Sequence, residues 1–409
     1  MSTRIAAELL PSFEMEKEVI IVRKYQEMKD QFDVEELEKK CEVVQKGKPS
    51  IVTDLLGDPI GRVRYLPLHA MLVAEYRKEI VGVIRGSIRT VSRGKNESND
   101  EFQKYVKVAY IGGLRVSPSH RRFGIATKLV EQLEEWFIRN GAEYAYMATD
   151  CSNQASINLF TQKCNYVKFR TPRVLVQPIN AHYKHIPSGI SIIQIPPQLA
   201  ITYYTQIFKN SEFYPLDIDL ILNHKLNLGT FMALPNKFIP NWDPRTGKLP
   251  NCYAILSIWN TKEVYKLQVK GLSAWKQAFC LGERLLDTLM PCLKVHSIPT
   301  VLESFGFHQL FGLHVEGKNS KNLMKGLCNF AHNMARNDSD CGLLITEVSQ
   351  TDPVCEGIPY CKKYSWDEDL WCMKKLEVNS KKGSDDKCLD DWTKPQVSSS
   401  VIFVDPRDF

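Results

Sequence analysis

The segment that most constrains the fold of this chain is LRVSPSHRRFGIATKLVEQLEEWF, residues 114–137. It begins as an apolar strand, runs into a cluster of cationic side chains, passes a glycine and continues as a long helix from about Ile125. This helix keeps Leu129 and Leu133 on one apolar stripe, with its glutamates away from that stripe. A strand that leads into a helix through a short basic loop is typical of an α/β fold.

Strand and helix patterns alternate on both sides of this segment. Strands are expected at 18–26, in a hairpin over 68–91, and at 105–118, 142–150 and 166–176, and helices at 33–44 and 152–164. Gly112 and Gly113 interrupt the strand before the basic loop, where paired glycines favour a bulge or the close approach of another backbone. The alternation predicts an α/β domain that is complete near Val176.

The remainder of the chain changes character from about Ser188, with more aromatic residues and prolines. Placed without gaps, residues 113–150 fall on residues 312–349, so that GLRV meets GLHV and EYAYMATD meets GLLITEVS. This match favours a diverged repeat of one fold, and the coincidence of two strand-helix-strand units is the alternative.

The predicted division is an N-terminal extension (1–17), a first domain (18–179), a second domain (188–378) and a C-terminal tail (379–409). The gapless alignment places Ser320, Leu323 and Lys325 where Arg121, Gly124 and Ala126 stand in the first domain. The second domain is therefore expected to lack the basic, glycine-containing loop.

Composition narrows the class of protein. The 409 residues, 44% of them hydrophobic, are enough for two or three ordinary packed cores. No run of eighteen apolar residues occurs and the N-terminus lacks a secretory pattern, so no membrane is expected and the location is expected to be cytosolic or nuclear. Twelve cysteines without a CxxC pair indicate reduced thiols. A net charge of +6 permits an acidic partner without arguing for one.

The basic loop has a physical reason to bind an anion. The first turn of a helix presents unpaired backbone N–H groups and a partial positive charge. Gly124 lets the backbone approach a bulky anion, and Arg115, Arg121 and Arg122 add positive charge. A pyrophosphate fits this description. A solvated loop, a nucleic-acid patch and a glycine that serves only a tight turn are the alternatives.

The string Arg121-Arg122-Phe123-Gly124-Ile125-Ala126 matches (Q/R)-x-x-G-x-(G/A), and it resembles the loop of the GNAT acetyltransferases. The resemblance implies a GNAT fold with a mixed sheet and a loop that holds the pyrophosphate of acetyl-CoA. The residues that it implies for acetyl-CoA binding lie on the strand, the loop and the next helices: Leu114, Arg115, Val116, Arg121, Arg122, Phe123, Gly124, Ile125, Ala126, Thr127, Asn153 and Phe160.

Seven blocks extend the resemblance over nearly the whole chain: TDLLGDPI, LRVSPSHRR, EEWFIRNGAEYAY, NQASINLFTQKC, LDIDLILNHKLNLGTF, DEDLWCMKKL and FVDPRDF. They are similar to the plant Hookless-type N-acetyltransferases. This resemblance implies an acetyl-CoA-dependent enzyme of the nucleus that acetylates a protein amine, a histone lysine being one candidate, in ethylene- and auxin-linked differential growth. With the internal repeat, the GNAT resemblance of the first domain makes the second domain a degenerate GNAT-like half.

Direct acetyl transfer needs a neutral amine, hydrogen-bond donors for the thioester oxygen and a proton for the departing thiolate. Asp150 and Glu75 are the candidate bases, although an acid just before a helix is also typical of a cap. The backbone N–H of Leu114 is the candidate oxyanion donor. Many GNAT members place a tyrosine where this chain has Phe160, so Tyr166 or solvent is expected to supply the proton.

Three further expectations concern the alternative function, a metal and nucleic acid. A regulatory or scaffold protein that binds acetyl-CoA with little turnover is the alternative function, motivated by Phe160 and the lack of an obvious base. His182 and His185 form HxxH without a convincing third ligand, so no metal is expected. Direct nucleic-acid binding would rest on the arginine loop alone and is not expected.

Overall fold

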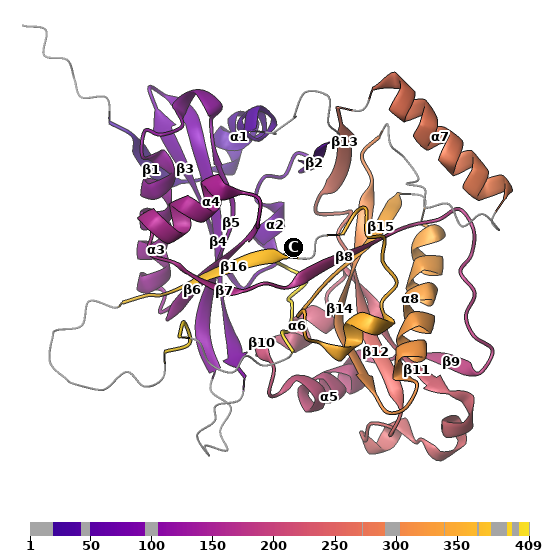
Figure 1. The fold of residues 1–409 in the computed structure, drawn as a ribbon. Helices are drawn as coiled ribbons and strands as arrows, with labels where there is room; N and C mark the ends of the chain where they lie inside the picture. The colour runs from indigo at the N-terminus through magenta and orange to yellow at the C-terminus, as the bar shows by residue number, and fades with distance from the viewer. Residues whose placement is uncertain are drawn as a thin grey trace, which may run out of the picture.

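The computed structural model describes residues 19–41, 50–94, 105–271, 273–290, 303–338, 340–365, 368–377, 391–394 and 401–408. The predicted N-terminal extension and most of the predicted C-terminal tail lie outside these residues. Two large sheets stand beside one another, each with helices packed against it (Figure 1). Within the described residues, no helix combines the length and the apolar character needed to cross a membrane.

The first sheet is mixed, in the order β1-β3-β4-β5-β6-β16-β7. Its strands are β1 (Ile21–Lys24), β3 (Leu68–Tyr76), β4 (Glu79–Arg93), β5 (Tyr105–Val116), β6 (Tyr144–Asp150), β16 (Asp369–Lys375) and β7 (Val167–Arg170), and β10 (Glu212–Pro215) also pairs with β4. The β5–β6 pair is parallel and its neighbours are antiparallel.

Helices cover the two faces of this sheet differently. Helix α3 (Ile125–Arg139) packs its apolar stripe on one face, together with α4 (Gln154–Asn158) and a π-helical turn, η2 (Leu159–Lys163). Helix α1 (Glu27–Cys41) packs on the opposite face, and α2 (Gly61–Arg64) follows it in the chain.

The second sheet has the order β8-β15-β14-β12-β11-β9. Its strands are β8 (Arg173–Pro178), β15 (Cys341–Val348), β14 (Gly306–Glu316), β12 (Tyr253–Asn260), β11 (Asn227–Pro235) and β9 (Ile190–Ile195). Helix α8 (Ser320–Arg336) covers one face, and α5 (Pro197–Phe208) and α6 (Ile218–Leu222) cover the other. Helix α7 (Ala274–Leu289) lies at the periphery (Figure 1).

The two sheets repeat one design. In each, a central parallel pair is formed by strands on either side of a long helix, β5 and β6 in the first and β14 and β15 in the second. The gapless alignment equates Gly113 with Gly312, and both have φ +60°. Each lies at an irregularity in the antiparallel pairing of its strand, of β5 with β4 and of β14 with β12. Such a shared bulge favours a true repeat over coincidence.

The halves also exchange strands. The sequence predicts one strand over 166–176 that closes the first unit, and this prediction is wrong. The chain breaks around Pro172, which has no N–H to donate to a ladder, so β7 stays in the first sheet whereas β8 pairs with β15 in the second. In return β16, near the end of the chain, inserts between β6 and β7.

Two more connections join the halves. Strand β2 (Ser50–Asp54) pairs with β13 (Lys266–Lys270) in a separate two-stranded sheet. Residues 401–408 lie between the large sheets, since Ile402 and Val404 pack against strands of the first and Phe403 packs against helices of the second. The described part of the chain is therefore assembled from segments that cross between the two ranges predicted as domains.

Candidate active site

Strands β5 and β6 separate at one end. Their parallel pairing runs from Val108–Tyr144 to Ile111–Met147 and stops there, while β5 continues to Val116 beside β4 alone. The bulge at Gly113 turns β5 at the point of separation. Within the described residues, no strand covers the edge that the backbone of residues 114–116 turns towards β6, and the sequence places Leu114 at this edge as a donor.

The basic loop ends at the start of α3 with an open backbone. The first intrahelical bond runs from Lys128 N to Gly124 O at 3.0 Å, so the N–H groups of the preceding turn have no helical acceptor. Arg122 and Gly124 have φ values of +69° and +76°, and nothing lies within 4 Å of the position a Cβ would take at Gly124. Residues 121–124 are all exposed. This geometry provides a cradle of N–H groups for an anion.

The three arginines of this region are not equivalent. Arg115 lies 3.4 Å from a carboxylate oxygen of Glu38 on α1, and the same glutamate accepts a 2.8 Å hydrogen bond from the buried Arg85. Part of the charge of Arg115 is therefore neutralised within the protein. Arg121 and Arg122 lie in the exposed loop.

The predicted bases and acid are placed differently from what the sequence suggests. Glu75 lies on β3, two strands from β5, in a 3.0 Å ion pair with Arg23. Asp150 ends β6 and accepts a 2.6 Å hydrogen bond from the N–H of Ser152, as a turn-stabilising residue does. Tyr166 is 2% exposed, and burial raises the pKa of its hydroxyl well above its usual range. The structure does not bring these three residues together.

Asn153 and Phe160 occupy the helix beside β6. The Asn153 side chain caps α4 by accepting a hydrogen bond from Ser156 N at 3.2 Å. Phe160 is 1% exposed and packs edge-on against Tyr166, with ring centroids 5.1 Å apart. Phe160 lies in the π-helical turn, a local irregularity that often occurs at functional sites.

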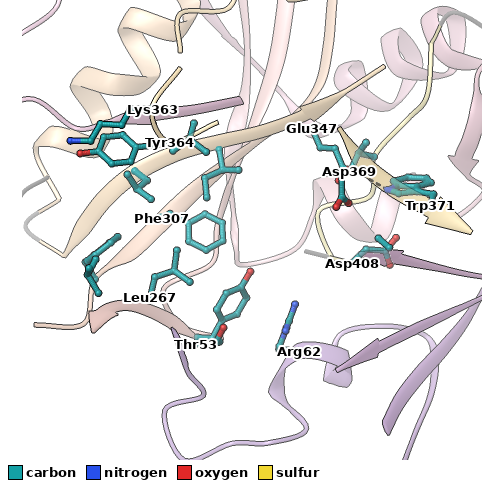
Figure 2. Close-up of a pocket in the computed structure, with 18 of the residues that line it drawn as sticks. Thr53, Arg62, Leu267, Phe307, Glu347, Lys363, Tyr364, Asp369, Trp371 and Asp408 are labelled. Carbon is teal, nitrogen blue, oxygen red and sulfur yellow. Dashed lines mark hydrogen bonds between the residues drawn. The ribbon is translucent and has the colours of Figure 1, made fainter. Parts of the chain in front are cut away.

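Sequence reasoning missed a large cavity on the other face of the sheet. It measures about 640 Å³ and is lined by strands of both sheets, by α2 and α7 and by the C-terminal segment (Figure 2). Three of its carboxylates cluster at one end: Glu347 on β15, Asp369 on β16 and Asp408 (Figure 2). Such a group of acids in a largely apolar cavity is typical of a functional site.

Burial raises the pKa of all three of these carboxylates. Burial and then the charge of Asp369 raise the pKa of Glu347 well above its usual range. Burial and then the charge of Asp150 raise the pKa of Asp369 to about 6. Asp408 is held by hydrogen bonds from Arg89 and from the Tyr146 hydroxyl. Asp150 therefore affects the cavity by raising the pKa of Asp369.

One signal in the sequence points to this cluster. Glu347 is a charged residue inside the apolar strand pattern GLLITEVS, and the gapless repeat alignment sets it opposite Ala148. A buried acid in such a strand is a candidate functional group. No pattern along the chain shows that β16 crosses to the first sheet, so the partners of Glu347 could not be named. Within the described ranges, no group of histidine, cysteine and acidic side chains could hold a metal ion.

Comparisons with known proteins agree with this architecture. The family model described as acetyltransferase (GNAT) family matches residues 33–166. The chain is 45% identical over 410 residues to an Arabidopsis thaliana protein named "Probable N-acetyltransferase HLS1", covering 95% of this chain and all of the relative. It is 36% identical to "Acetyl transferase GW6a" of Oryza sativa subsp. japonica, covering 97% and 99% of the two chains.

Among solved structures, Saccharomyces cerevisiae N-myristoyltransferase with bound myristoyl-CoA superposes with a TM-score of 0.54 at 10% identity. The match covers 91% of this chain and 82% of the other. At this identity the likeness concerns the fold alone. Together with the family match and the two sheet systems, it confirms the predicted mixed α/β fold with a second GNAT-like half.

Proposed function

Because this chain belongs to the GNAT acetyltransferases, in their Hookless-type branch, we propose that it transfers the acetyl group of acetyl-CoA directly to an amine of a protein. One observation carries the proposal: the open N–H groups at the start of α3 adjoin the uncovered edge of β5. The loop suits a pyrophosphate and the edge suits an extended, amide-containing arm, which together are the parts of coenzyme A.

Three groups of residues in the first half would have separate roles in acetyl-CoA binding and acetyl transfer. The loop Arg121–Thr127 would hold the pyrophosphate, and the edge at Leu114–Val116 would hydrogen-bond the pantetheine arm. The N–H of Leu114, just after the bulge, would donate to the thioester oxygen as it gains charge. Acetyl-CoA supplies an activated acyl group whose thiolate leaves readily.

Protonation of that thiolate needs neither Phe160 nor Tyr166. Phe160 has no proton to give, and the raised pKa of buried Tyr166 makes its hydroxyl a poor acid. A thiolate, with an ordinary pKa near 8.5, takes its proton readily from solvent. The lack of a tyrosine at position 160 is therefore compatible with turnover.

The proposal extends to the biology of the relatives. A protein acceptor such as a histone, a nuclear location and a part in ethylene- and auxin-linked differential growth are proposed from the resemblance to the Hookless-type proteins alone.

The test is calorimetric binding of acetyl-CoA to the full chain and to Gly124→Glu. A carboxylate at position 124 would occupy the anion cradle, so binding should be lost. Gly141→Glu is the matched control, since Gly141 also has a positive φ, +79°, and follows the opposite end of the same helix. Absence of binding by the folded wild-type protein, or wild-type affinity in Gly124→Glu, would overturn the proposal. Binding without transfer of labelled acetyl to any acceptor would favour the regulatory alternative.

A further inference from the structure

The cavity lies across the first sheet from helix α3. Along β5 and β6, Ile111 and Met147 point into the core under α3, whereas Tyr110 and Ala148 line the cavity. The β5–β6 pairing ends at Ile111–Met147. The two strands that line the cavity are therefore also the two strands that separate next to the anion-binding loop. A group bound along β5 and a group in the cavity would meet at this gap from opposite faces.

The cavity has two chemically different ends. One end has Leu267 and Phe307 among its walls, beside Lys363 and Tyr364, and the other end carries Glu347 and Asp369 (Figure 2). Both acids and the apolar residues named here come from the second half of the chain, whereas Thr53, Arg62, Tyr110 and Ala148 come from the first half. The cavity therefore exists only because the two halves pack together.

The three acids Glu347, Asp369 and Asp408 are not equivalent. Asp408 already accepts hydrogen bonds from Arg89 and Tyr146, which compensate its charge. Glu347 accepts one hydrogen bond, on Oε1, from Trp371 Nε1 at 2.9 Å, which leaves Oε2 for another donor. The charged side chains that share the cavity with Glu347 are Arg62, Glu283, Lys363, Asp369 and Asp408.

We propose that this cavity is the acceptor site, that it takes a primary amine at the end of an apolar stem such as a lysine side chain, and that Glu347 accepts the amine proton. The inference rests on the proposed acetyl transfer and names its acceptor class and base. A lysine side chain has the matching form, because its methylene stem suits apolar walls and its ammonium suits carboxylates.

The proposed step balances without another reactant. The ammonium gives one proton to the Glu347 carboxylate, and the neutral nitrogen forms a bond to the carbonyl carbon of the thioester. The C–S bond breaks, the thiolate takes the proton that the new amide nitrogen loses, and Glu347 releases its proton to solvent. Trp371 holds Oε1, so Oε2 would take this proton from the amine once Glu347 is ionised, and because burial raises the pKa of Glu347 the rate of transfer should increase with pH as the carboxylate forms.

The test uses the full chain, labelled acetyl-CoA and poly-L-lysine as the acceptor probe. Glu347→Gln keeps an acceptor for Trp371, and we expect unchanged acetyl-CoA affinity with kcat/KM lowered about 100-fold at pH 7. This loss should shrink towards pH 10, where lysine amines become neutral without a base. Ile345→Trp, which narrows the cavity beside Glu347, should lower transfer while the cradle still binds acetyl-CoA. Glu263→Gln, with a side chain 52% exposed, is the matched control.

The outcomes separate this inference from the proposed function. If the wild-type protein does not bind acetyl-CoA, both the proposed function and the acceptor site are overturned. Normal binding with wild-type transfer in both Glu347→Gln and Ile345→Trp would overturn the acceptor site and leave the function standing. Normal binding with no acetylation of poly-L-lysine by the wild type would overturn the lysine-type amine as acceptor. A loss in Glu347→Gln that is equal at pH 7 and pH 10 would indicate a structural role and exclude the base.

Discussion

Glu347 of the second sheet accepts a 2.9 Å hydrogen bond from the indole nitrogen of Trp371, which lies in the first sheet. Trp371 reaches this position because β16 leaves the second half of the chain and inserts between β6 and β7. The acidic end of the cavity is thus built from strands that have been exchanged. Each half depends on the other both for a strand and for the site.

This exchange predicts one cooperative unfolding transition for the whole protein. Without β16 the first sheet is split between β6 and β7, and without β8 the second sheet loses the edge strand that pairs with β15. We expect a single calorimetric peak, and we expect residues 19–178 expressed alone to remain unfolded or aggregated. Two separated peaks, or a folded and monomeric fragment, would show that the halves are independent.

The sequence predicted the local elements better than their assembly. Helix α3 and its loop were predictable, because an apolar stripe, a glycine and a cluster of arginines lie within one short segment. The exchange of β8 and β16 was not, because an apolar strand pattern says that a strand is buried without saying in which sheet. The candidate site divided in the same way: the basic loop could be proposed from one short segment, whereas Asp369 and Glu347 were missed because they meet only across the exchange.

Asp369→Asn should stabilise the protein at neutral pH. The pKa of Asp369 is raised from 3.8 to about 6, so the folded state binds this proton more tightly than the unfolded state does. Stability from this group is therefore full below about pH 4 and is lost as pH rises through 6. The asparagine variant avoids this loss and should be more stable by about 1–3 kcal/mol at pH 7.5, with little difference at pH 4.

Urea unfolding at a series of pH values measures this difference. Asp340→Asn, at a side chain that is 58% exposed, is the control and should show no comparable gain. A constant difference between Asp369→Asn and wild type across the pH range would contradict the assignment.

Gly113→Ala and Gly124→Ala should differ sharply although both glycines have positive φ values. The Cβ of alanine at 113 would overlap the guanidinium of Arg85, which is buried and fixed by Pro59 O at 2.6 Å. At 124 the space is open, so only the left-handed backbone is disfavoured. We expect a loss of at least about 3 kcal/mol in the free energy of unfolding at 113 and about 1 kcal/mol at 124. Equal losses would mean that Arg85 moves aside.

Asp408→Ala should be strongly destabilising, because it leaves a buried cation without its main partner. The Arg89 side chain is 2% exposed and donates to both oxygens of Asp408, and Asp405 lies 3.7 Å from Arg89 Nε as a second, weaker partner. Removal of one member of such a buried pair costs about 3 kcal/mol or more.

The double variant Arg89→Met with Asp408→Ala removes both charges, so it should lose less stability than the sum of the two single variants. Denaturant unfolding of the four proteins gives the coupling energy. A coupling energy near zero would show that Asp405 and the Tyr146 hydroxyl alone stabilise Arg89. The Arg89–Asp408 pair would then not stabilise the packing of residues 401–408 on the first sheet.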